Sequence, residues 1–222
     1  MRIPRTSPRL SRVGSQRALL LLAMTHLTGC APIITQQAVF TYPSLLPEGT
    51  LPLTAQLAPL TDTRPESEQK VLRAVTNVAE QVTATLLRDF RAAKLFERLD
   101  MAGASAEVPD LLLRGELVSF TWKSRDYVKS YFPPFFFMAF FGYPVGSNVG
   151  TVHIRLEVLH AKTQQRLAAY DKRDTTEAPY TAWNQFEYRK SGGQELGDAL
   201  RVVSEALKDA LLADRQRLLG AR

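Results

Sequence analysis

Apolar residues that recur every three or four positions predict two amphipathic helices in this chain. One such stripe lies between Glu68 and Lys94 and comprises Val71, Val75, Val78, Val82, Leu86 and Phe90. The other follows Ser191, a residue suited to cap a helix, and comprises Leu196, Leu200, Val203, Leu207 and Leu211. A stripe of this spacing is typical of a helix that buries one face. We therefore predict one continuous helix in each region.

Alternation of apolar and polar residues predicts strands elsewhere. The clearest lies at 149–160, where Val152, Ile154, Leu156 and Val158 share one face. Segment 110–123 has apolar residues on both faces, so we expect both sides of it to be partly covered. Residues 161–165 form a turn that joins 149–160 to a further strand at 166–174 as a hairpin. Shorter strands are predicted at 51–60 and 96–101.

This order of elements predicts an α+β fold, because two amphipathic helices need a sheet face to cover. We expect a two-layer sandwich, in which a four- or five-stranded, mostly antiparallel sheet carries both helices on one face. Residues 51–222 would form a single domain with an aromatic-rich insertion at about 124–148. Residues 30–50, which include three prolines, would form an extended tether.

The N-terminus has the pattern of a signal peptide rather than of a folded element. Five arginines precede a short apolar run at 18–24, and no acidic residue occurs before Cys30. The run is much shorter than the roughly 20 residues that cross a bilayer as a helix. The segment ends in Leu27-Thr28-Gly29-Cys30 and resembles the lipobox of bacterial lipoproteins. A secretory signal with a chance cysteine is the alternative interpretation.

The lipobox resemblance implies removal of residues 1–29 and covalent attachment of lipid to Cys30. Anchoring by more than one acyl chain is durable. Ala31 follows the cysteine, in place of the aspartate that retains lipoproteins in the proteobacterial inner membrane. We therefore expect an anchor in the outer membrane of a Gram-negative cell, with the domain facing the periplasm, and no cofactor besides the lipid.

The net charge and the cysteine count limit the functions that the chain can have. Without the five signal arginines, the 28 basic residues fall to 23, against 22 acidic ones. This near-neutral balance gives no support to nucleic-acid binding, which needs a concentrated basic surface. Cys30 is the only cysteine, so a disulfide within the chain and thiol catalysis are both excluded.

The sequence shows no catalytic constellation, and we expect that the protein is not an enzyme. His153 and His160 lie seven residues apart on one strand, so they should face opposite sides of the sheet and should not share a metal ion. No nucleophile motif or glycine-rich phosphate loop occurs. Asp62 and Arg64 are expected to pair and hold a turn. Residues 171–174, which are all charged, are expected at a solvated strand end.

The unusual segment is 131–144, which holds six of the eleven phenylalanines. Pro133 and Pro134 should break any helix there. Because connections normally run over the surface, this segment predicts an exposed apolar patch. Three interpretations stay open: contact with a protein partner or a second copy, insertion into a membrane surface, and packing into the core. The candidate contact residues are Phe132, Phe135, Phe136, Phe137, Phe140, Phe141 and Tyr143.

A second aromatic group follows the last predicted strand and either covers the sheet edge or extends the phenylalanine-rich surface. It comprises Tyr180, Trp183, Phe186 and Tyr188.

Several of these features together resemble small outer-membrane lipoproteins of the YajG type, and more distantly the TolB N-terminal and CsgG-like assembly domains. They are the lipobox, the turn at 60–65, the helix end at 86–90, the strand at 110–122 and the closing helix. The resemblance implies a non-enzymatic, membrane-anchored accessory or assembly subunit of a cell-envelope complex. The alternative is an oligomeric structural component of a secretion or export apparatus.

Overall fold

The computed structural model of the protein describes residue 40 and residues 50–71, 77–104, 106–127, 135–184 and 193–220. Residues 33–222 form one compact unit and residues 1–32 another. The predicted signal peptide, Cys30 and the tether apart from Phe40 and Thr50 lie outside the described residues. None of the helices in the described ranges is long and apolar enough to cross a membrane.

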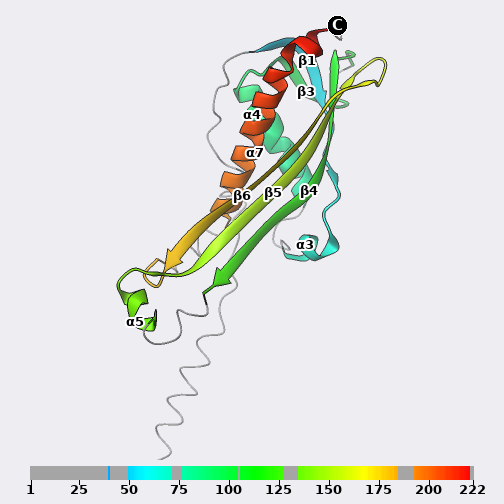
Figure 1. Ribbon diagram of the computed structural model, residues 1–222. Coiled ribbons are helices and arrows are strands. Elements are labelled where there is room, and N and C mark those ends of the chain that lie inside the picture. The colour runs from blue at the N-terminus through cyan, green and yellow to red at the C-terminus, as the bar shows by residue number, and fades with distance from the viewer. Residues whose placement is uncertain are drawn as a thin grey trace, which may run out of the picture. The chain divides into compact units, whose positions relative to one another are not determined.

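A sheet of six strands forms one layer of this unit (Figure 1). The strands are β1 (Leu51–Leu57), β2 (Thr61–Asp62), β3 (Phe96–Met101), β4 (Leu111–Asp126), β5 (Pro144–His160) and β6 (Arg166–Thr181). Their order is β3-β1-β4-β5-β6, and β2 lies alongside β4. The predicted α+β class is confirmed, but the strand number is higher than the four or five expected.

The pairing is mixed rather than mostly antiparallel. Long antiparallel ladders join β4 to β5 and β5 to β6, whereas β1 is parallel to both β3 and β4. The reason lies in the connection: the chain passes through a helix between β1 and β3. Such a crossover brings the second strand back in the same direction as the first. Alternation along the sequence reports which face is buried but not which way a neighbouring strand runs.

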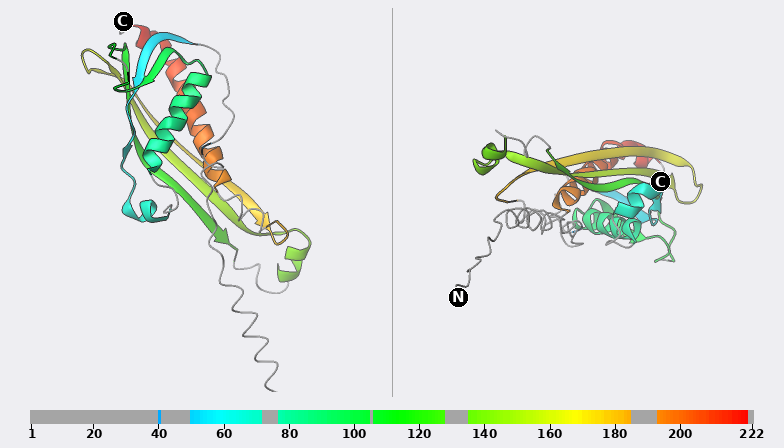
Figure 2. Two further views of the ribbon diagram at one scale, coloured as in Figure 1. Left: turned by 180° about the vertical axis from the view of Figure 1, so that it is seen from behind. Right: turned by 90° about the horizontal axis from the view of Figure 1, so that it is seen from below.

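Two long helices, α4 (Val78–Ala92) and α7 (Gln194–Ala213), cover the same face of the sheet (Figure 2). The described residues of the two predicted stripes are buried, including Leu86, Phe90, Leu200 and Leu207 at 0% exposure. Between the helices, Asp89 accepts a hydrogen bond from the Ser204 hydroxyl and pairs with Lys208 at 3.3 Å. The two helices of the second layer are therefore bonded to each other in addition to packing on the sheet.

The single helix predicted from 68 to 94 is interrupted. A short helix α3 (Glu66–Val71) and α4 are separate elements, and Asn77 directly precedes α4 with φ 55° and ψ 45°. This left-handed conformation cannot continue a right-handed helix, and asparagine is one of the few residues that adopt it readily. The last turn of the fold is a short helix α8 (Arg215–Leu219).

A β-bulge in β4 explains its apolar residues on both predicted faces. Leu117 lies opposite Ile154 and Ser119 lies opposite His153, so Val118 is an extra residue. The extra residue reverses the alternation, because side chains in a strand change face at every position. Residues on either side of it, such as Leu117 and Phe120, are therefore buried in the same core. The other side of this strand is partly covered, as expected, because Thr121 is buried there and the Ser119 hydroxyl bonds to Glu68 of α3.

One residue of the predicted tether is fixed on the domain. Phe40 is buried and its ring stacks on that of Phe120, with centroids 6.0 Å apart and planes inclined by 5°. The Arg88 guanidinium also donates a hydrogen bond to the Phe40 carbonyl oxygen. The N-terminal segment is thus attached to β4 and α4 at a point ten residues after Cys30.

Strands β4 and β5 extend well into the predicted insertion from both sides, so the connection between them spans 127–143 rather than 124–148. This connection contains a short helix α5 (Phe135–Phe140). The expectation that Pro133 and Pro134 exclude a helix was wrong, because proline is tolerated directly before and at the first turn. Helix α5 lies beyond the ends of β4 and β5, at the end of the sheet remote from the C-terminus (Figure 1).

Candidate contact surface at the end of the sheet

Helix α5 ends in a defined turn that sets the direction of the residues after it. The Tyr143 amide donates to the Met138 carbonyl at 3.3 Å, and the Gly142 amide donates to the Ala139 carbonyl at 3.3 Å. Gly142 has φ 85°. These two bonds around a left-handed glycine form a Schellman motif. The motif turns the chain out of α5 and into β5 within four residues.

Five aromatic side chains are exposed around this turn, and we call them the aromatic tip. Their exposed fractions are 40% for Tyr127, 62% for Phe137, 85% for Phe141, 56% for Tyr143 and 67% for Trp183. Only two other large hydrophobic side chains in the described ranges are comparably exposed, Val108 and Val202. Exposed apolar surface is therefore concentrated at one end, which marks a contact surface.

The register of the strands places the members of the aromatic tip together although they come from distant segments. Asp126 pairs with Gly146 at the end of β4, and the Tyr127 amide donates to the Val145 carbonyl at 2.8 Å. Thr181 pairs with Pro144 at the end of β6. Tyr127, Tyr143 and Trp183 therefore leave the sheet at the same end. The sequence indicated the phenylalanines and Tyr143 and left open whether Trp183 extends this surface; the structure places Trp183 at the same end and adds Tyr127.

A buried tyrosine holds the three strand ends beneath the tip. Tyr180 is 3% exposed, and its hydroxyl donates to the Asp126 carboxylate. A side chain at Gly146 would overlap this hydroxyl and the Arg125 carbonyl. Glycine is therefore required at this point of β5, between the ends of β4 and β6.

The start of α7 is fixed to the sheet a short distance behind the tip. The Trp122 indole N–H donates to Glu195 at 3.0 Å, and the Asn148 amide donates to the same carboxylate at 3.4 Å. Gly150 allows the α7 backbone at Glu195 and Leu196 to approach closely, since a methyl group there would overlap it. Glu195 lies in the first helical turn, where a negative charge is favourable.

Charged residues near the tip are unevenly distributed. No aspartate or glutamate occurs from Tyr127 through Leu156, or from 178 through 186. Lys123 and Arg125, near the end of β4, are exposed. The exposed aromatic rings therefore lie in segments free of carboxylates, and the border at the end of β4 carries two cations, Lys123 and Arg125, and one carboxylate, Asp126, which is bonded to Tyr180.

Of the predicted contact residues, the structure shows Phe137, Phe141 and Tyr143 at the surface, not in the core. Phe135, Phe136 and Phe140 belong to α5, but their side chains lie outside what is described, as do Phe132 and Cys30. Of the second aromatic group, Tyr180 is buried and Trp183 is exposed, and Phe186 and Tyr188 lie outside the described ranges. The contact role of all these residues stays a prediction.

The Asp62–Arg64 pair forms as expected and lies away from the tip, beside the middle of β4. Arg64 Nε and Nη2 donate to the two carboxylate oxygens of Asp62 at 2.9 and 2.7 Å. These hydrogen bonds lower the pKa of the Asp62 carboxyl, against the opposing effect of its partial burial. The pair holds the turn between β2 and α3.

The two strand histidines are not brought together. His153 bonds to Asp171 on β6, and this bond, followed by that from Arg155, lowers the pKa of the Asp171 carboxyl. His160 instead accepts a hydrogen bond from the Thr163 amide in the turn after β5. No group of three or more possible metal ligands occurs in the described part of the chain. Residues 171–174 lie in the middle of β6, not at a strand end as predicted, because β6 continues to Thr181.

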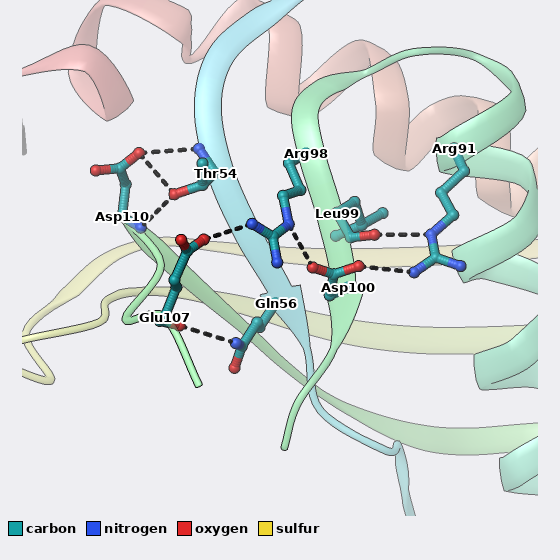
Figure 3. A network of polar contacts seen from close by, with 8 residues as sticks. All are labelled: Thr54, Gln56, Arg91, Arg98, Leu99, Asp100, Glu107 and Asp110. Carbon is teal, nitrogen blue, oxygen red and sulfur yellow. Dashed lines mark hydrogen bonds and ion pairs between the residues drawn. The ribbon is translucent and has the colours of Figure 1, made fainter. Parts of the chain in front are cut away.

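A polar network lies at the other end of the sheet (Figure 3). Arg98 donates to Asp100 at 2.7 Å and also pairs with Glu107, and Arg91 reaches Asp100 at 3.1 Å. Asp110 accepts hydrogen bonds from the Thr54 amide and hydroxyl, both at 2.9 Å. The charged groups in this network are occupied with one another. The network therefore joins the loop before β4 to β1 and β3, and we interpret it as structural.

Comparison with known proteins shows the fold only. No family model and no curated protein matches the sequence. A Xanthomonas campestris protein of the DUF330 family superposes with a TM-score of 0.50 at 12% identity, covering 79% of this chain and 94% of that one. The PelC dodecamer from Paraburkholderia phytofirmans gives 0.40 at 10% identity, with 75% and 91% covered. Lipoprotein GNA1162 from Neisseria meningitidis gives 0.27 at 11% identity, with 70% and 99% covered.

The likeness to the Xanthomonas protein indicates a shared fold, and its identity is too low to indicate a shared function. The resemblance to YajG-type lipoproteins and to TolB or CsgG-like domains stays a prediction.

Proposed function

We propose that this protein is a lipid-anchored, non-enzymatic accessory or assembly subunit of a cell-envelope complex. In this proposal Cys30 carries the lipid in the outer membrane and the domain faces the periplasm. The protein acts through its surfaces rather than through a reaction.

The observation that carries the proposal is the aromatic tip. Five exposed aromatic side chains at one end of a well-packed sheet are costly to leave in water, because apolar surface gains free energy when it is covered. The rest of the unit buries its apolar stripes in a single core. A fold that packs so completely elsewhere keeps this end apolar for contact with something outside the chain.

The experiment that tests the proposal is a native mass measurement on the full-length protein, extracted with mild detergent from its own membranes. We expect acylated protein together with foreign subunits in fixed stoichiometry. A large mass made of this chain alone would instead support an oligomeric structural component of a secretion or export apparatus. A lone acylated monomer would contradict both assembly roles.

The anchor has a separate test. Cys30→Ser should release the protein from the membrane fraction into the soluble periplasmic fraction, because the thiol that carries the lipid is lost. Retention of the variant in the membrane, with no acyl mass on the wild-type protein, would contradict the proposed lipidation.

A further inference from the structure

We propose that the aromatic tip inserts into the interfacial region of the same bilayer that holds the Cys30 lipid, so that the protein touches one membrane at two points. The inference rests on the proposed lipid anchor and names what the tip contacts. It follows from the kind of side chains exposed, the charges beside them and the reach of the N-terminal segment.

The exposed side chains match a bilayer interface in chemistry. Tyr143 and Trp183 are 56% and 67% exposed, and each combines an apolar ring with one polar group. Such residues are enriched where hydrocarbon meets water, with the ring in the apolar region and the polar group near the headgroups. Phe137 and Phe141, at 62% and 85% exposure, are the purely apolar members that would enter furthest.

The charges beside the tip match headgroups. Segments 127–156 and 178–186 hold no carboxylate, and the exposed carboxylate nearest to the tip, Asp126, accepts a hydrogen bond from the Tyr180 hydroxyl. Exposed Lys123 and Arg125 stand four and two residues before Tyr127, where they would meet anionic headgroups as the rings enter. An apolar groove on a partner protein would accept the rings equally well. Such a groove does not by itself require cations beside the rings, whereas a bilayer with anionic headgroups does.

The N-terminal segment has the right length. Phe40 is fixed on Phe120 and lies ten residues after Cys30, a sequence separation that can span at most about 35 Å. From Phe120 to Asp126, where β4 ends, is six residues, or about 20 Å along a strand. The lipid and the tip can therefore lie at one level.

The same length would allow the opposite end of the sheet to face the membrane, but that end is polar. It carries the turn at 161–165, with Lys162, Thr163 and Gln164 exposed, and the network of Figure 3. Among the described residues at that end, Val108 is the one large hydrophobic side chain that is exposed. The distribution of apolar side chains thus selects the aromatic tip.

Tryptophan fluorescence gives a direct test, because the two tryptophans differ. Trp122 is buried and bonded to Glu195, whereas Trp183 belongs to the tip. The full-length acylated protein is reconstituted into vesicles of phosphatidylethanolamine and phosphatidylglycerol with brominated acyl chains. We expect quenching in the wild-type protein and none in Trp183→Phe, which retains only the buried indole.

Matched charge substitutions separate the tip from the anchor. Phe137→Asp combined with Phe141→Asp should abolish the quenching of Trp183 while the protein still floats with the vesicles through its lipid. Val108→Asp, an equally exposed position at the polar end, should change neither result. Each substitution is also made together with Trp183→Phe, where unaltered emission of Trp122 shows that the fold is retained.

Two outcomes overturn the inference. One is unquenched Trp183 in wild-type protein that floats with the vesicles. The other is protection of Trp183 only in native membranes, with crosslinks from the tip to another protein or to a second copy. Absence of acyl mass and of flotation is a failure of the proposed anchor instead. The quenching of unacylated protein at high vesicle concentration then still tests the tip.

Discussion

The indole N–H of Trp122 on β4 donates to the carboxylate of Glu195 at the start of α7, with 3.0 Å between nitrogen and oxygen. Both side chains are buried, at 5% and 2% exposure. This bond ties the second layer of the fold to the part of the sheet that leads to the aromatic tip. It is therefore a sensitive point for stability.

Glu195→Leu should lower the free energy of unfolding by about 1–3 kcal/mol, because it leaves buried donors on Trp122 and Asn148 without their acceptor. Glu195→Gln keeps an acceptor oxygen and should lose less. Urea unfolding followed by tryptophan emission measures both. Equal losses for the two variants would show that the bond itself contributes little.

Gly150→Ala should destabilise the protein by about 1–3 kcal/mol, because its methyl group would overlap the α7 backbone at Glu195 and Leu196. Gly220→Ala is the matched control, since its surroundings leave room for a methyl group and its φ is −67°. Thermal unfolding should separate the two variants clearly. A Gly150→Ala protein as stable as the wild type would mean that α7 sits further from β5.

Asp62→Asn should cost about 1 kcal/mol near neutral pH, since the carboxylate partly compensates the buried Arg64 cation. The pKa of Asp62 is lowered in the folded protein, so its contribution is present above the unfolded value near 4 and is lost as the pH falls through the folded value. The stability difference between wild type and variant should therefore shrink in acid. A difference that stayed constant down to pH 2 would contradict the assignment.

Phe40→Ala should lower the stability of the unit by about 2–4 kcal/mol through lost burial and lost stacking on Phe120. Amide hydrogen exchange around Phe120 should increase in the variant. If the variant exchanged at the wild-type rate around Phe120, this would show that Phe40 does not pack on Phe120. Tyr42→Ala is a nearby aromatic substitution for comparison.

The helices and the buried strand faces were predictable because burial leaves a period in the sequence. Leu86 and Phe90 on α4, or Ile154 and Leu156 on β5, are spaced as the geometry of a helix or strand requires. The exposed candidates Phe137 and Phe141 were likewise visible, since so many phenylalanines in a connection have no strand or helix stripe to belong to.

Other features depend on contacts that no local pattern records. The extra residue Val118 in β4 shifts the alternation of apolar residues by one position, so core residues of one face stand at both odd and even positions. Asn77 interrupts an otherwise regular helical stripe. Gly146 hides the continuation of β5 before the predicted strand at 149–160, because a glycine has no side chain with which to mark a face. Trp183 joins the tip only through the register of β6 on β5, which is a long-range property.

The stacking of Phe40 on Phe120 also decides where mechanical load enters the protein. A pull on the N-terminal segment acts first on that ring and on the Arg88 bond, and not on β1. If Phe40 slips out, the segment from Phe40 to Thr50 can extend to at most about 35 Å before the sheet is loaded. Single-molecule pulling should show this small release ahead of the main unfolding step, and its absence would contradict the idea. If the membrane moved away from the domain, the segment between Cys30 and β1 would lengthen while the strands stayed paired.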